Sequence, residues 1–171
     1  MTTPEMLAAL DGMVCLVDSR EQDTPRLRRR LRDIGIPHER QKLNVGDYSA
    51  KFPLPDGKWV QVPVSLERKM DATELAGCYC QQRARFEREF ERARETNTKL
   101  YLLIESTNWE EIYSGQYRSK MKPKALVASI LAWLARYDCQ IIFCEPRTTG
   151  KLIHDILYRE GKEMLERMVD E

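Results

Sequence analysis

Three short apolar runs constrain the fold of this chain more than any other feature. Residues 13–17 (MVCLV) and 100–104 (LYLLI) are wholly apolar, and residues 140–144 (QIIFC) are apolar after the first position. Such runs, without polar alternation, are typical of strands buried on both faces of a sheet. A helical pattern over residues 123–137 separates the last two runs, and the order strand–helix–strand is typical of a parallel sheet. The sequence therefore predicts an α/β fold in which helices flank a sheet.

The length of 171 residues and the 42% hydrophobic content predict one compact domain over residues 1–171. No run approaches 18 apolar residues and the first residues do not resemble a signal peptide, so we expect a soluble cytoplasmic protein without a membrane partner, associated with the nucleoid in a bacterium. Five cysteines without a C-x-x-C pair predict reduced thiols and argue against zinc. The net charge of +1 argues against a nonspecific DNA-coating protein but is compatible with a local basic patch.

The remaining segments predict a succession of short helices and strands. Helices are expected at residues 4–10, 24–34 and 71–94, short strands at 38–43, 46–51 and 59–69, and one or two helices over 147–159 and 161–169 with a break at Gly161. The turn signal Pro55-Asp56-Gly57 predicts a hairpin folded about residues 56 and 57, which pairs Asp47 with a position within one residue of Glu67. Because Pro53, Pro55 and Pro63 lack a backbone donor, we expect this hairpin to be irregular or at an edge.

An E-x-K sequence on the predicted strand 59–69 is the first candidate for chemistry. Successive side chains of a strand alternate between its faces, so Glu67 and Lys69 are expected to point the same way. Together with Asp47 they would supply two carboxylates and an ammonium, the minimal set that holds a divalent metal against a phosphate and activates water. Oxygen ligands favour Mg²⁺ or Mn²⁺ over zinc. A lone E-x-K is more often an ordinary pair of surface charges, so the interpretation depends on the other acidic motifs.

Basic side chains gather in three stretches that are candidates for contact with a nucleic acid. Helix 24–34 carries five arginines, for which a solvated face and a phosphate contact are equally good interpretations. Most charges of residues 71–94 are interpreted as solvated i,i+4 pairs. In the connection 105–124, Trp109 and Tyr113 are expected to pack within the loop, whereas its basic residues are functional candidates. The candidate nucleic-acid ligands are Arg20, Arg28, Arg83, Arg85, Arg118, Lys120 and Lys122.

Three acidic motifs occur in a fixed order: V-D-S-R-E at residues 17–21, G-D-Y at 46–48 and L-E-R-K at 66–69. This set resembles the nuclease domain of the XPF-type structure-specific endonucleases, a branch of the restriction-endonuclease-like fold, over about residues 13–160. The resemblance implies a central mixed sheet flanked by helices, a metal-dependent cleavage centre, branched or flapped DNA as substrate in repair or recombination, and pairing as a homodimer or heterodimer through this domain. The implied catalytic residues are Asp18, Glu21, Asp47, Glu67, Arg68 and Lys69, of which Asp47, Glu67 and Asp18 would bind Mg²⁺ or Mn²⁺.

The sequence departs from the family pattern in two ways. The family usually places an aspartate four residues after the lysine of E-R-K, and this chain has Thr73 there. Asp71 and Glu74 flank that position, but shifts of two residues or one on a helix rotate a side chain by roughly 200° or 100°, so neither acid is a direct substitute. The chain also has no room for the helix-hairpin-helix or helicase domain that the family often adds. We therefore expect substrate choice to come from this domain or from a partner.

Two other functions compete with a metal-dependent endonuclease. The main alternative is a noncatalytic DNA-binding subunit, because the family includes paired catalytic and inactive chains; the three complete motifs disfavour it and Thr73 favours it. An α/β small-molecule enzyme or nucleotide binder is disfavoured, because neither G-x-G-x-x-G nor G-x-x-x-x-G-K-[ST] occurs in the chain.

Overall fold

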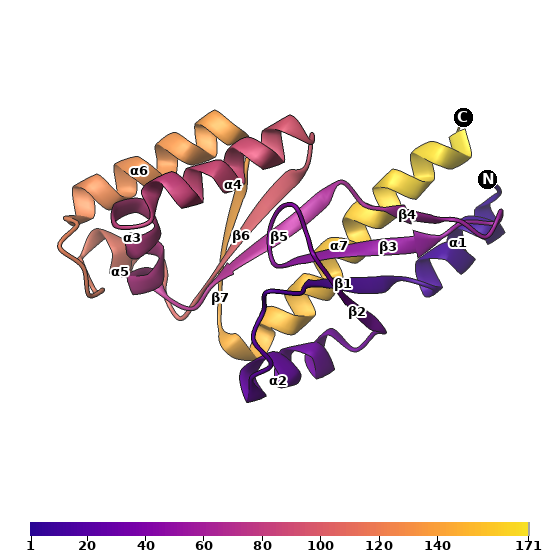
Figure 1. Cartoon of the computed structure of the whole chain (residues 1–171), viewed down its shortest axis with the longest axis horizontal. Helices are drawn as coiled ribbons and strands as arrows, with labels where there is room; N and C mark the ends of the chain where they lie inside the picture. The colour runs from indigo at the N-terminus through magenta and orange to yellow at the C-terminus, as the bar shows by residue number, and fades with distance from the viewer. Residues whose placement is uncertain (171) are drawn as a thin grey trace. The chain divides into compact units, whose positions relative to one another are not determined.

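The computed structural model of the chain describes residues 1–170 (Figure 1). These residues form two compact units. The first contains residues 1–43, 47–64 and the chain from residue 150 onward, and the second contains residues 44–46 and 65–149. No helix among the described residues is both long enough and apolar enough to cross a membrane.

Four strands and three helices make up the first unit. β1 (Val14–Asp18) pairs in parallel with β2 (His38–Gln41) and antiparallel with β3 (Tyr48–Pro53), and β3 pairs antiparallel with β4 (Trp59–Gln61). The helices are α1 (Thr3–Asp11), α2 (Pro25–Ile34) and, from Gly150 onward, α7 (Pro146–Asp170), which runs alongside these strands in Figure 1. All five residues of β1 are buried, which confirms the prediction of a strand covered on both faces.

The bounds of α2 follow from its capping residues. Thr24 accepts a hydrogen bond from Leu27 N on its side-chain oxygen at 3.1 Å, and Pro25 occupies the first helical position, where its missing N–H costs nothing. Gly35 ends the helix in the left-handed conformation with φ of 74°, which glycine adopts without strain. Leu27 and Ile34 are buried, and the predicted helix over residues 24–34 is confirmed.

The second unit contains three neighbouring strands: β5 (Val64–Lys69), β6 (Lys99–Glu105) and β7 (Gln140–Cys144). The first residue of β5, Val64, belongs to the first unit. Its helices are α3 (Ala72–Cys80), α4 (Arg83–Glu95), α5 (Trp109–Tyr113) and α6 (Pro123–Tyr137). β6 and β7 are parallel, with Leu102 opposite Ile141, and α6 connects them. The predicted strand–helix–strand arrangement is therefore confirmed, and parallel and antiparallel pairs together make the fold a mixed α/β fold.

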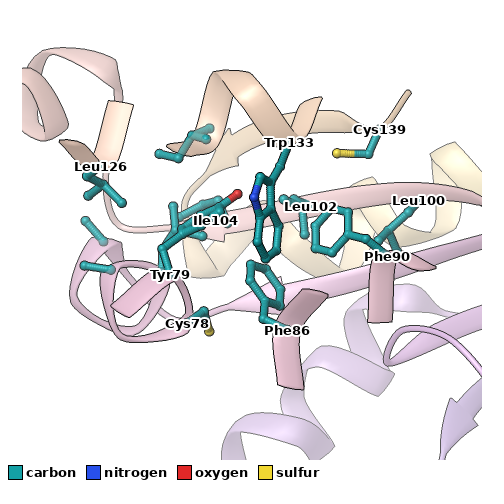
Figure 2. Packing of buried hydrophobic residues seen from close by; sticks show 14 of the residues in the cluster. Cys78, Tyr79, Phe86, Phe90, Leu100, Leu102, Ile104, Leu126, Trp133 and Cys139 are labelled. Atoms are coloured by element: carbon teal, nitrogen blue, oxygen red, sulfur yellow. The ribbon is translucent and has the colours of Figure 1, made fainter. Parts of the chain in front are cut away.

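Aromatic side chains from α3, α4 and α6 form the core of the second unit (Figure 2). Trp133 is fully buried, and its ring centroid lies 4.8 Å from that of Tyr79 and 5.0 Å from that of Phe90, edge to face in both cases. Phe86 packs on the same tryptophan at 5.4 Å. Such offset and edge-to-face pairs are the favoured geometries of aromatic rings, so this cluster ties the three helices together.

The predicted strand 59–69 is wrong as a single element. β4 ends at Gln61 and β5 begins at Val64, because Pro63 between them has no N–H for a ladder hydrogen bond. The register pairs Lys51 with Gln61 and Pro53 with Trp59, which confirms a hairpin centred on residue 56. Asp47 and Glu67, which the hairpin was expected to bring together, both lie outside these paired positions of β3 and β4.

Three helix predictions are also corrected. The segment 71–94 divides into α3 and α4 at Gln82, whose φ of −111° and ψ of 20° are not helical, and this change of direction lets Tyr79 and Phe86 both pack on the core tryptophan. Gly161 lies inside the continuous helix α7 rather than at a break. A Cβ at this position would lie 2.0 Å from Cζ of Phe52 on β3, so the glycine permits close packing of helix on strand. The connection 105–124 contains the unexpected short helix α5.

Candidate functional site

The turn after β1 is built on the buried carboxylate of Asp18. Its Oδ1 accepts hydrogen bonds from Arg20 N at 2.7 Å and Arg20 Nε at 2.9 Å, and its Oδ2 accepts from Arg20 Nη2 at 2.6 Å and Leu43 N at 3.2 Å. Burial alone raises the pKa of this carboxyl, but these hydrogen bonds outweigh burial and the pKa lies below its ordinary value. Asp18 is therefore a charged residue whose acceptor positions already fix the V-D-S-R-E turn.

Two further predicted acids of the first unit, Glu21 and Asp47, lie near the phenol of Tyr48. Asp18 N donates to Asp47 O at 2.9 Å, which places the residue before β3 beside the end of β1. Tyr48 is fully buried and accepts a hydrogen bond from Arg30 Nη1 at 2.8 Å. Burial raises the pKa of Tyr48, and the negative charges of Glu21 and Asp47 add to this effect. The structure thus brings Asp18, Glu21 and Asp47 to one end of this unit's strands.

The predicted pair Glu67 and Lys69 is present on one face of β5 in the second unit. Lys69 Nζ donates to Glu67 Oε1 at 2.5 Å, and both side chains are about nine-tenths buried. Burial raises the pKa of Glu67; Lys69 opposes this shift, and the charges of Glu89 and Glu74 add to it. The E-x-K prediction of a shared face is confirmed. The charges of Glu74 and Glu89 thus act on Glu67 together with Lys69, and Arg92 in turn pairs with Glu89.

Glu89 on α4 is a residue of this site that the sequence interpretation missed. Its Oε1 accepts from Gly46 N at 2.6 Å, and its Oε2 accepts from Arg92 Nη2 at 2.5 Å. Arg92 in turn donates through Nε to Asn44 O at 2.9 Å. Glu89 and Arg92 therefore hold residues 44–46, which immediately precede Asp47 in the chain. On the sequence they are indistinguishable from the i,i+3 ion pairs of an exposed helix face.

Arg68 lies on the opposite face of β5 from Glu67 and Lys69, as strand alternation requires. Its Nη1 donates to Glu105 Oε2 at 3.0 Å, and the Oε1 atom of the same carboxylate accepts from Thr149 Oγ1 at 2.7 Å. Glu105 is almost fully buried at the end of β6. The structure thus gives Arg68 a contact that fixes β5 against β6.

The two acids considered as replacements at position 73 cap α3. Asp71 Oδ1 accepts from Glu74 N at 2.8 Å, and Glu74 Oε2 accepts from Met70 N at 2.6 Å, so both satisfy backbone donors at the start of the helix. Thr73 itself accepts a hydrogen bond on Oγ1 from Arg118 N at 3.0 Å. The position of the expected family acid is therefore a contact between α3 and the loop before α6.

The predicted nucleic-acid ligands fall into two groups in the structure. Three of them have side-chain contacts within their own unit: Arg20 with Asp18, Arg28 with Asp23 at 2.8 Å, and Arg83 over the ring of Trp133 at 5.4 Å. The other four, Arg85, Arg118, Lys120 and Lys122, are exposed, and the contact of Arg118 with Thr73 is made by its backbone N–H. An exposed cation can bind an anionic ligand without losing an internal side-chain contact. These four residues therefore remain the candidates for binding a nucleic acid.

The donor chemistry of the site suits Mg²⁺ or Mn²⁺, since every side-chain candidate is a carboxylate oxygen. Among residues 1–170, no group of three or more His, Cys, Asp or Glu side chains is arranged to hold a metal ion. Magnesium usually takes only one or two protein carboxylates and completes its coordination with water and substrate phosphate, so a three-residue cage is not required. The carboxylate of Glu67, with those of Glu74 and Glu89 acting on it, is of the donor type that such a cation takes.

The fold and the motifs define a mixed α/β protein with acidic groups and a lysine at strand ends. Residues 17–156 match the ERCC4 domain, and the chain belongs to this family. The structure is similar to that of XPF from Aeropyrum pernix, with a TM-score of 0.63 and 19% identity over 91% of this chain and 68% of that chain. It is also similar to XPF from Aeropyrum pernix in complex with DNA, with a TM-score of 0.61 and 21% identity over 88% of this chain and 66% of that chain. No curated protein matches the sequence significantly.

Proposed function

We propose that this chain is a divalent-metal-dependent DNA endonuclease that hydrolyses phosphodiester bonds in branched or flapped DNA. The observation that carries the proposal is the Glu67–Lys69 pair, because a largely buried carboxylate with a raised pKa, close to two other carboxylates, is the environment expected of a functional group. Membership of the ERCC4 domain family supports the reaction class. We propose branched DNA as the substrate, and repair or recombination as the process, because the three sequence motifs resemble those of the structure-specific endonucleases.

In this proposal each motif residue has a separate task. Asp47 and Glu67 would hold Mg²⁺ or Mn²⁺, which when bound supplies an activated water and stabilises charge on the phosphate. Lys69, whose ammonium lies 2.5 Å from Glu67, would contact the scissile phosphate and offset its negative charge. Glu21 remains a candidate for orienting the attacking water.

Asp18 and Arg68 are better suited to positioning than to direct chemistry. Coordination of a metal by Asp18 would require Arg20 or Leu43 to give up a hydrogen bond, because four donors already contact its two oxygens. Arg68 would lose its contact with Glu105 if it turned toward a substrate. We therefore assign Asp18 to the orientation of the V-D-S-R-E turn and Arg68 to the orientation of β5.

The test is cleavage of labelled flap, fork, Holliday-junction, linear duplex and single-stranded DNA with and without Mg²⁺ or Mn²⁺. Glu67→Gln and Asp47→Asn should each abolish cutting and leave DNA binding largely intact. Glu95→Gln, a charge change of the same size at an exposed position of α4, should cut like the unmodified protein. Absence of metal-dependent cutting on every substrate would contradict the proposal.

A noncatalytic DNA-binding subunit is the second candidate, favoured by Thr73 at the position of the family acid. Calorimetric titration with Mg²⁺ or Mn²⁺ separates the two functions. A nuclease should show a metal site that Asp47→Asn removes, whereas an inactive subunit should show none. Pairing of two copies through this domain stays a prediction, and a light-scattering mass with and without DNA tests it.

A further inference from the structure

We infer that the loop of residues 117–122 binds the phosphate backbone of the DNA and that Thr73 is the residue that positions this loop. The inference rests on the proposed function for the identity of the polyanion. Its structural basis lies entirely within the second unit. Thr73 occupies the position where the family usually has an aspartate, and we assign it the role of holding the loop in place.

Two residues four positions apart anchor the loop inward, and the cations between and beside them are exposed. Tyr117 and Met121 are partly buried against the aromatic core of the second unit, and Tyr117 OH donates to Met121 O at 2.8 Å, which closes the loop on itself. Between and beside these anchors, Arg118, Lys120 and Lys122 are exposed. The geometry therefore displays three positive side chains from a short, internally fixed segment.

The loop lies in a long stretch of sequence whose own charged residues are all positive. Residues 112–137 contain Arg118, Lys120, Lys122, Lys124 and Arg136 but no aspartate or glutamate. Several exposed cations elsewhere pair with an acid, as Arg28 does with Asp23 and Arg94 with Glu91. In this stretch Arg136 pairs with Glu87 of α4, whereas Arg118, Lys120 and Lys122 belong to the loop itself. A cationic segment without internal acids favours a polyanion, and contacts to phosphate position a nucleic acid without reading its sequence.

Thr73 fixes the loop to the first turn of α3. Its Oγ1 accepts from Arg118 N at 3.0 Å, between residues 45 positions apart in the chain. α3 begins three residues after Lys69, which is the last residue of β5 and the ion-pair partner of Glu67. The hydroxyl thus ties the basic loop at Arg118 to the helix that follows the E-R-K motif. Thr73 is a positioning residue, since it touches the loop and not the substrate.

The first test measures DNA binding in EDTA, so that it does not depend on cleavage. The triple variant Arg118→Gln, Lys120→Gln, Lys122→Gln should weaken binding of a labelled duplex and reduce the slope of log Kd against log salt by about 2 to 3. The matched control Arg147→Gln, Lys151→Gln, Arg159→Gln removes the same charge from exposed positions of α7 and should leave the slope unchanged. An unchanged slope in the loop variant, or an equal reduction in both, would overturn the inference.

The second test isolates the threonine hydroxyl. Thr73→Val removes the acceptor at nearly constant volume and should weaken binding about 3- to 10-fold, the value of one hydrogen bond, while trypsin cleaves after Arg118 and Lys120 several times faster. Thr73→Ser keeps a hydroxyl and should restore both properties. If Thr73→Val matches the unmodified protein in affinity and in trypsin cleavage, Thr73 does not position the loop. If the chain binds DNA as predicted here but cuts none of the substrates, the proposed nuclease activity is refuted and the proposed DNA-binding loop is not.

Discussion

Two buried carboxylates, one in each unit, are held in opposite ways. Asp18 in the first unit accepts four hydrogen bonds from Arg20 and Leu43, and its pKa is lowered. Glu67 in the second unit has Lys69 as a cationic partner, lies near the charges of Glu89 and Glu74, and its pKa is raised. The same kind of residue in a motif therefore serves two purposes. A carboxylate held by four donors stabilises a turn, whereas one with a single cationic partner and a raised pKa is the candidate for the chemistry.

The largest expected difference between the two carboxylates is in DNA cleavage. Glu67→Gln should lower the single-turnover rate by more than about 100-fold, because loss even of groups that only orient a metal ligand costs about 10- to 100-fold. Asp18→Asn should lower the rate by about 10-fold at a temperature where the variant is folded, because it loosens the turn that carries Glu21 without removing a ligand. Equal losses in the two variants would break the distinction between them.

The next effect concerns the clamp that Glu89 and Arg92 form on residues 44–46. Glu89→Ala should lower the cleavage rate by about 10- to 100-fold with little change in DNA affinity, because Gly46 N loses its acceptor and the residue before Asp47 is freed. Glu89→Gln keeps an acceptor oxygen and should retain most of the activity. Glu95→Ala, on the same helix, serves as the control. A rate that falls equally in the Gln and Ala variants would show that the charge of Glu89, not its position, is what matters.

The sequence predicted the strands and helices better than it predicted contacts between them. Buried strands such as β1 and β6 were recognisable because their apolar runs admit few other structures, and α2 was defined by its own capping residues. The apolar run of β7 also forms a strand, but its residues are only partly buried because β7 lies at the end of the strand order. The break at Gln82 and the role of Gly161 were not predictable, because each depends on a distant side chain, Trp133 in one case and Phe52 in the other.

The same limit applies to the candidate site. The motifs identified Glu67 and Lys69, whose shared face follows from strand alternation alone. Glu89 and Thr73 were missed as contacts because their partners, Gly46 and Arg118, lie 43 and 45 positions away. Local patterns encode periodicity and capping. They do not encode which backbone N–H a distant side chain will meet.

A smaller effect is expected in stability at pH 7. Asp18→Asn should lower the free energy of unfolding by about 2 kcal/mol, because the amide replaces one charged acceptor by a donor that faces Arg20. Glu67→Gln should leave the free energy of unfolding unchanged or raise it slightly, since its amide oxygen can still accept from Lys69 while negative charge beside Glu89 and Glu74 is removed. Urea unfolding in EDTA measures both. Destabilisation of the two variants by the same amount would show that both carboxylates serve the fold.

The dependence of these differences on pH sharpens the comparison further. The folded pKa of Asp18 is lowered, so its stabilisation is present above the unfolded pKa of about 3.9 and is lost as the pH falls through the folded pKa. The folded pKa of Glu67 is raised, so its ionised form begins to cost stability as the pH rises above the unfolded pKa of about 4.3. As the pH is lowered from 7 toward 4 and below, the difference in free energy of unfolding between each variant and the unmodified protein should shrink toward zero. This difference starts negative for Asp18→Asn and zero or positive for Glu67→Gln. Urea titrations at several pH values in EDTA would contradict this picture if the two differences had the same sign, because one environment would then describe both carboxylates.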